Sequence, residues 1–137
     1  MPPPHLTKFT CLDCRSTFKR PTDAAKRNVA RAIEIRTCPN CTGAAYLMSS
    51  DFRAPPKADD RAWAVVAFLV RSGFAYFRIY EDVPLAAFGH PMRRPKGLLS
   101  AQRRLAYPET LREAEQFVRD YGHLALPFVD TRVAPGG

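Results

Sequence analysis

Residues 37–43 read TCPNCTG, and the two cysteines in this stretch decide how the front of the chain folds. Cys38 and Cys41 are separated by two residues and are followed by Thr42 and Gly43. A second pair with the same spacing, Cys11 and Cys14 in the stretch CLDC, lies nearer the N-terminus, and the chain has no other cysteine. Two residues between thiolates let both sulfurs point inward from one tight turn, so two such turns can supply four thiolates to one tetrahedral metal ion.

Three uses of paired cysteines compete here: a disulfide, redox chemistry and metal binding. The N-terminus has no apolar run typical of a signal peptide, and no stretch approaches the roughly 20 apolar residues of a membrane span. We therefore expect a cytoplasmic protein in a reducing compartment, where stable disulfides are disfavoured. A thioredoxin-like motif is a single Cys-x-x-Cys that opens a helix, whereas this chain has two pairs and the second is followed by a turn.

The cysteine pattern thus predicts one structural Zn²⁺ held by four ligands, Cys11, Cys14, Cys38 and Cys41. Tetrahedral sulfur also suits iron, so the spacing leaves the choice between zinc and iron open. A closed site of four cysteines has no open coordination position, so we expect the metal to fold the domain and not to catalyse a reaction.

At CLDC and CPNCTG the sequence resembles the zinc-ribbon class, in which two knuckles at the tips of β-hairpins clamp one zinc ion. The resemblance covers about residues 8–48. Three later pieces, DFRAPPKADDRAW, RSGFAYF and YPETLREAEQFV, are similar to segments of small bacterial zinc-ribbon proteins of unassigned role. The spacer between the pairs, residues 15–37, is longer than the usual span of about 15 to 20 residues, which indicates an insertion.

The insertion is predicted to contain a short basic helix over residues 24–33, capped by Thr22 or Asp23, with Ala25, Val29 and Ile33 on one face. Its cations make it a candidate phosphate-contacting surface, and the alternative is a merely solvated helix face. The candidate contacts in the spacer are Lys19, Arg20, Lys26, Arg27, Arg31 and Arg36. The aromatic residues Phe9, Phe18 and Tyr46 lie on the expected ribbon strands, where packing in a thin core is favoured over stacking on bases.

The whole chain is expected to be an α+β protein in which a zinc ribbon precedes a small helix-strand-loop-helix unit. The predicted segments are a flexible N-terminus (1–7), the ribbon with its insertion (8–50), a linker (51–58), the α+β unit (59–129) and a flexible tail (130–137). Within the ribbon, residues 44–48 are expected to complete a strand.

The α+β unit opens with a helix over about 59–72, capped by Asp59 or Asp60, whose apolar stripe is Trp63, Val66, Ala67 and Val70. A strand is expected over 74–80, with Phe74, Tyr76 and Arg78 on one face and Ala75, Phe77 and Ile79 on the other. A last helix begins at Pro108 or at the Thr110 capping box and ends at Gly122. Its predicted stripe is Leu111, Ala114, Phe117, Val118 and Tyr121, and residues 123–129 are expected to add an edge strand.

Between these elements, residues 83–107 form a second basic block that carries five cations and no acid. Prolines and glycines predict an irregular loop with up to two helical turns over 97–106. Such a loop indicates either a nucleic-acid contact or an unstructured segment. The candidate contacts are Arg93, Arg94, Lys96, Arg103 and Arg104.

The sequence contains no recognised catalytic motif. The three histidines are scattered, the His-x-Glu of zinc deaminases is absent, and there is no phosphate-binding glycine loop or nucleophile elbow. His90, inside the basic loop, is the one histidine worth testing as a functional group.

The net charge of +8 favours a polyanionic partner. We expect a non-catalytic protein that binds RNA, or a ribonucleoprotein such as the ribosome, in preference to DNA. The alternative is a protein-interaction adaptor on a larger machine such as RNA polymerase.

Overall fold

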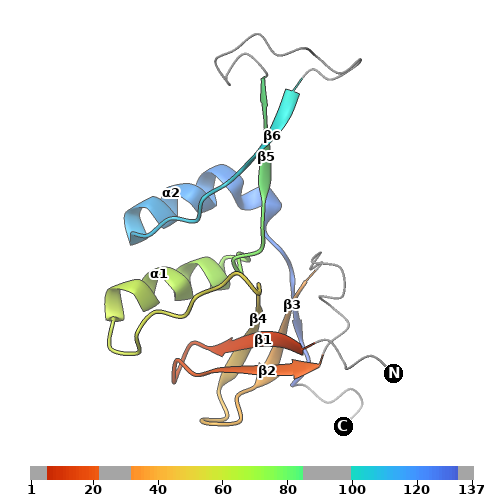
Figure 1. Cartoon of the computed structure of the whole chain (residues 1–137). Helices are drawn as coiled ribbons and strands as arrows, with labels where there is room; N and C mark the ends of the chain where they lie inside the picture. Colours follow the sequence, from red (N-terminus) through yellow and green to blue (C-terminus); the bar gives the residue numbers. More distant parts are fainter. Residues whose placement is uncertain (1–5, 22–31, 85–99, 133–137) are drawn as a thin grey trace.

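The computed structural model describes residues 6–21, 32–84 and 100–132. A five-stranded sheet has the order β2-β1-β4-β3-β7, and its strands are β1 (Leu6–Cys11), β2 (Thr17–Pro21), β3 (Ile33–Thr37), β4 (Ala44–Met48) and β7 (Phe128–Asp130). The remaining elements are α1 (Asp60–Arg71), the hairpin strands β5 (Tyr80–Pro84) and β6 (Ser100–Arg104), α2 (Leu111–Tyr121) and a 3₁₀ turn (Gly122–Leu124). Figure 1 shows the sheet at one end, the two helices above it and the hairpin extending from the far end. The α+β prediction is confirmed.

Strands form around Phe9, Phe18 and Tyr46, as predicted, and β3 was not predicted. β1 pairs antiparallel with both β2 and β4, and β4 also pairs with β3. Phe9 is fully buried and stacks on Phe18 with ring centroids 5.7 Å apart, while Tyr46 is half-buried and meets Phe128 edge-on at 6.1 Å. The prediction that these aromatic side chains fill the core is therefore confirmed for Phe9, and its two neighbours pack beside it.

Helix α1 connects two apolar clusters. The Asp59 side chain accepts a hydrogen bond from the Ala62 amide at 3.1 Å and caps the helix, as predicted. Trp63 packs against the sheet, and its indole Nε1 donates to the Pro56 carbonyl oxygen at 3.1 Å. On a neighbouring face Val65 and Leu69 pack against α2, so the helix buries more of its circumference than the predicted stripe.

The strand predicted over 74–80 is wrong, because pairing begins only at Tyr80. Tyr76 has a φ of +66°, which breaks an extended strand. Phe74 and Ala75 are both buried but belong to different clusters, Phe74 beside α2 and Ala75 beside the sheet. The apolar run therefore reflects a segment shared between two cores, so its predicted two-face alternation does not apply.

The predicted irregular loop over 83–107 is partly wrong. β5 and β6 form an antiparallel hairpin in which Tyr80 is opposite Arg104 and Pro84 is opposite Ser100. The helical turns predicted over 97–106 are therefore replaced by a strand at 100–104, since cross-strand pairing supplies the backbone hydrogen bonds. The rest of that prediction, residues 85–99 with His90, lies outside the described residues.

Helix α2 begins at the predicted capping box, where the Thr110 side chain accepts a hydrogen bond from the Glu113 amide at 3.2 Å. Ala114 and Phe117 are buried as predicted. Leu111 is 42% exposed, contrary to the prediction, because the helix packs through its middle turns and its first residue stays on the surface.

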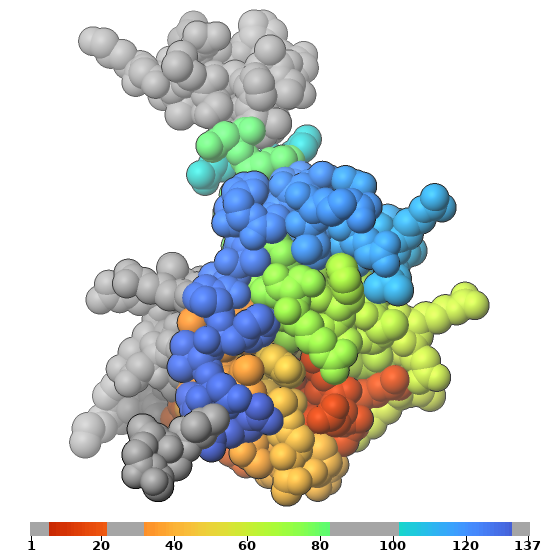
Figure 2. Space-filling view, turned by 180° about the vertical axis from the view of Figure 1, so that it is seen from behind, coloured from red at the N-terminus to blue at the C-terminus, as the bar shows by residue number. Residues whose placement is uncertain are grey.

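The edge strand predicted over 123–129 forms only as β7 at Phe128–Asp130, because residues 122–124 form the 3₁₀ turn. β7 pairs in parallel with β3, so this end of the chain returns to the first sheet. Figure 2 shows this C-terminal stretch running down the molecule beside the strands of the sheet. Thr131 continues the contact by donating its amide to the Ile35 carbonyl oxygen at 3.0 Å.

The inserted helix predicted over 24–33 falls mostly outside the described residues. Ile33 itself opens β3 and is fully buried, so the last position of that helix is wrong. A β-branched residue placed between two neighbouring strands fits the pleated sheet better than a helix end. The division into a ribbon and a separate α+β unit stays a prediction.

Candidate metal centre

The four cysteines come from two turns that the sheet brings together. Cys11 ends β1 and Cys14 lies in the turn to β2, whereas Cys38 follows β3 and Cys41 lies in the turn to β4. Cys11 is paired with Ala45, and Thr37 is paired with Ala44, so β4 aligns both turns at one end of the sheet. The register of three strands therefore determines where the sulfurs meet.

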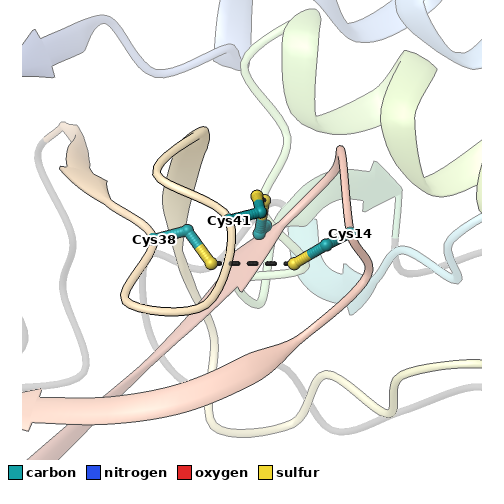
Figure 3. A group of neighbouring side chains, drawn as sticks. Cys14, Cys38 and Cys41 are labelled. Carbon is teal, nitrogen blue, oxygen red and sulfur yellow. Dashed lines mark hydrogen bonds between the residues drawn. The ribbon is translucent and has the colours of Figure 1, made fainter.

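The sulfurs are spaced for one metal ion. All four Sγ atoms lie within 4.8 Å of one another. Cys11 and Cys41 are 3.5 Å apart at Sγ, and Cys14 and Cys38 are 3.7 Å apart. Figure 3 shows the sulfurs of Cys14 and Cys38 pointing toward each other from the two turns. A tetrahedral ion with metal–sulfur bonds of about 2.3 Å places its ligands about 3.8 Å apart, so the prediction that these four residues form one metal site fits the structure.

The same distances exclude disulfides, whose sulfurs are bonded at about 2.05 Å. All four cysteines are free thiols.

The two turns repeat the same backbone pattern. The Cys11 amide donates to the Ser16 carbonyl oxygen at 2.9 Å, and the Cys38 amide donates to the Gly43 carbonyl oxygen at 2.8 Å. In the second turn, the amides of Asn40 and Gly43 donate to the sulfurs of Cys38 and Cys41, each at 3.4 Å. Amide donors stabilise negative charge on sulfur, so this backbone is arranged for thiolates.

Side chains around the sulfurs connect the two turns. Asn40 in the second turn donates its Nδ2 to Cys14 Sγ at 3.5 Å and to Ser16 Oγ at 3.2 Å, both in the first turn. A Cβ added to Gly43 would lie 2.4 Å from an Asp13 carboxylate oxygen and 3.2 Å from Cys41 Sγ, so the two turns approach each other closely at residue 43. Contacts of this kind orient ligands and affect metal affinity.

The surroundings divide the thiols into two kinds. Burial raises the pKa of the Cys11 thiol to about 12, whereas hydrogen bonds with Ser16 and Asn40 lower the pKa of Cys14 to about 6. A divalent cation at the centre favours the thiolate at every position, since metal binding displaces the protons. Four thiolates would then fill a tetrahedral coordination sphere.

The predicted nucleic-acid contacts are only partly described. Lys26, Arg27, Arg31, Arg93, Arg94 and Lys96 lie outside the described residues. Arg20 and Arg36 lie on the same face of the sheet, with their guanidinium groups 4.9 Å from the Phe18 ring and 4.8 Å from the Phe9 ring. The structure therefore brings these two cations together over the stacked rings.

Arg103 and Arg104 lie on β6, apart from the ribbon arginines, and both contact acids. Arg103 forms an ion pair with Glu81, and Arg104 Nη2 lies 3.5 Å from an oxygen of Asp51. The predicted contact Lys19, on β2, lines a cleft. Three further cations line the same cleft, and none of these three was a predicted nucleic-acid contact: Lys8, Arg53 and Arg78. Lys8 and Lys19 flank Phe9 and Phe18 in the sequence, but only the strand register shows that they meet.

No family model, curated protein or solved structure matches the chain. Over the described residues, no helix has the length and apolar character needed to cross a membrane.

Proposed function

We propose that the chain is a zinc protein of the ribbon type that binds nucleic acid without catalysis, with RNA or a ribonucleoprotein surface favoured over DNA. One structural relationship supports both parts of the proposal. Strands β1 and β4 bring the cysteines together at one end and line a cleft with four cations near the other. A metal that fixes the register of these strands would also fix the cationic surface.

Zinc is the metal that the ligand set favours in a structural role. Four thiolates in a closed tetrahedron suit zinc and iron, and exclude hard cations that prefer oxygen ligands. Cys11 and Cys38 are fully buried, so the centre is part of the core and its loss should loosen the sheet. Elemental analysis of the purified protein should give one zinc per chain, and iron in its place would contradict this part of the proposal.

Nucleic-acid binding is supported by charge. The chain carries a net +8, and the exposed arginines of β2 and β6 belong to two separate elements of the molecule. Cations that neutralise phosphates release counterions, so the affinity for RNA should fall steeply as the salt concentration rises. The preference for RNA is tested by competition between single-stranded RNA and DNA of the same sequence in one assay.

The test measures binding of a labelled RNA by fluorescence anisotropy over a range of salt concentrations. Reversal of four charges over residues 93–104, with glutamate at Arg93, Arg94, Arg103 and Arg104, should weaken binding and reduce the salt slope. The control reverses four exposed arginines of the two helices, Arg61, Arg71, Arg112 and Arg119, and so changes the net charge equally. If the first variant binds as the control does, residues 93–104 have no part in binding.

A second candidate function is an adaptor that docks on a larger protein machine such as RNA polymerase. Phe128 and Val129 on β7 are 41% and 51% exposed, and β7 is the last strand of the sheet among the described residues. Apolar side chains beside such a strand edge suit protein contacts. A pull-down from nuclease-treated lysate separates the candidates, since loss of all partners favours nucleic acid. Retention of one partner that a Phe128→Ser variant releases favours the adaptor.

A further inference from the structure

A cleft of about 260 Å³ opens near the end of β1 and β4 that is remote from the cysteines. Four of its lining residues are cations, Lys8, Lys19, Arg53 and Arg78, and Asp51 is its one acid among the described residues. This concentration of positive charge differs from an ordinary surface, where both signs are interspersed.

Two of the cations oppose each other directly. Lys8 on β1 is paired with Lys19 on β2, so their side chains leave the same face of the sheet at neighbouring positions. Like charges placed opposite each other across strands are destabilising. A bound anion would relieve the repulsion between Lys8 and Lys19.

Lys8 is held in place at the cleft. Its side chain is half-buried, and its Nζ donates to the Phe52 carbonyl oxygen at 2.7 Å. Burial, followed by the charges of Arg53 and Lys19, lowers the pKa of Lys8. An ammonium with a fixed position and spare donors can bind an anion with little loss of side-chain entropy.

The cleft's acid does not neutralise these three cations. Asp51 accepts a hydrogen bond from Arg78 Nε at 2.8 Å and lies 3.5 Å from Arg104. Within the described part of the chain, no carboxylate lies at ion-pair distance from Lys8, Lys19 or Arg53. With four cations and one acid in its lining, the cleft keeps a net positive charge that an external anion can balance.

We propose that this cleft binds one backbone phosphate of a nucleic acid, with Lys8, Lys19 and Arg53 as its ligands. The proposal rests on the proposed function and adds to it the place where a phosphate lies. Lysine ammonium groups act as point charges that suit the spherical phosphate, whereas a lone carboxylate is better matched by a single forked arginine.

The size and the remaining walls of the cleft favour a nucleotide unit over a large cofactor. Its volume is slightly below the range of about 300 to 1,000 Å³ that is typical of small-molecule pockets. Leu6 and the half-buried Phe77 supply apolar walls beside the cations. A nucleotide unit presents both a charged phosphate and a base whose face can pack on apolar side chains, so it matches this lining better than inorganic phosphate does.

The test uses the zinc-loaded full chain and a short labelled oligoribonucleotide. Substitution of two exposed cleft cations, Lys19→Gln with Arg53→Gln, should weaken binding by about tenfold and reduce the salt slope by about one. The control, Lys57→Gln with Arg61→Gln, removes the same charge from exposed positions outside the cleft lining and should change affinity less than about twofold. Zinc content and thermal melting verify that both variants are folded.

Two further probes identify the source of the phosphate. In NMR titrations, inorganic phosphate and a mononucleotide should shift the amide signals of Lys8 and Lys19 weakly, and the oligonucleotide should shift them strongly. If the cleft variant binds the oligonucleotide as tightly as the control does, the phosphate site is wrong while the proposed function stands. If the chain binds no nucleic acid, the proposed function fails. If only the mononucleotide shifts the amide signals, the bound phosphate does not come from a nucleic-acid backbone. Competition by polyglutamate as strong as that by the oligonucleotide would overturn the choice of phosphate.

Discussion

Arg15 and Thr42 occupy equivalent positions, each directly after the second cysteine of its pair, and both have a left-handed backbone with φ values of +62° and +65°. This conformation lets each turn close around a sulfur. It costs a residue with a β-carbon about 1–2 kcal/mol, which glycine avoids. The two turns therefore carry the same strain, and the long Arg15 side chain offsets it through bonds to the Lys57 carbonyl oxygen and to Asp60.

Thr42→Gly should stabilise the metal-bound protein by about 1 kcal/mol, because glycine adopts a positive φ without strain. The substitution removes the hydrogen bond that Thr42 Oγ1 donates to the Cys41 carbonyl oxygen, which lies in an exposed turn where water can replace the donor. Denaturant unfolding measures the change. The control Thr37→Gly in β3 should destabilise the protein by about 0.5–1 kcal/mol. Equal losses of stability in both variants would contradict the strain argument.

Removal of the metal should be visible at Trp63, the only tryptophan. Arg15 directly follows the ligand Cys14 in the chain. Its guanidinium lies 5.8 Å from the centre of the Trp63 ring and forms an ion pair with Asp60 at 2.7 Å. A chelator that releases the first turn should therefore change the tryptophan emission and lower the melting temperature, and added zinc should restore both.

Two variants control this experiment. Cys38→Ser should remove the response to chelator, because the site has lost a buried ligand. Arg15→Ala should keep one metal per chain and a metal-dependent melting temperature, but its emission should respond less. If the chelator changes neither the tryptophan emission nor the melting temperature of the unmodified protein, the cysteines bind no structural metal.

Alkaline pH should destabilise the protein through two half-buried tyrosines, Tyr76 and Tyr107. Burial raises the pKa of Tyr76 to about 12 and also raises that of Tyr107. An unfolded tyrosine ionises near pH 10, so between about pH 10 and 12 the unfolded state releases protons that the folded state retains. The free energy of unfolding is therefore unaffected by these groups below about pH 10 and falls as the pH rises toward about 12.

Tyr76→Phe should reduce this alkaline loss without abolishing it, because Tyr107 still contributes. The measurement compares the free energy of unfolding at about pH 8 and about pH 11. Tyr80→Phe serves as the control, since Tyr80 is 45% exposed, and it should retain the full loss. An equal loss in Tyr76→Phe and in the unmodified protein would remove Tyr76 as a cause.

The features that sequence reasoning predicts well are local. The cysteine spacing defines each turn, and the capping residues Asp59 and Thr110 fix where both helices begin. Each signal acts within a few residues, so neighbouring side chains suffice to predict it.

The features that it misses depend on pairing between distant segments. β5 and β6 carry charged residues such as Glu81 and Arg103, which pair across the hairpin and give no apolar alternation. The cationic cleft requires the register that sets Lys8 opposite Lys19, and no periodicity along one strand contains that register.

Gly73 follows α1 and contacts the segment that leads into β7, so its replacement should strongly lower the stability of the protein. It has a φ of +97°, and an added Cβ would lie 2.8 Å from both the Ala125 Cβ and the Leu126 carbonyl oxygen. Its carbonyl oxygen accepts the Leu126 amide at 2.9 Å, which positions the segment that leads into β7. Gly73→Ala should cost at least about 2 kcal/mol, because backbone strain and overpacking add.

Gly122 offers the matched control, since it is helical with a φ of −55° and an added Cβ would meet nothing within 4 Å. Gly122→Ala should stabilise by about 0.4–1 kcal/mol through the unfolded chain. Denaturant unfolding of both variants tests the pair, and a Gly73→Ala protein as stable as Gly122→Ala would mean that this connection does not hold the end of the chain against the sheet.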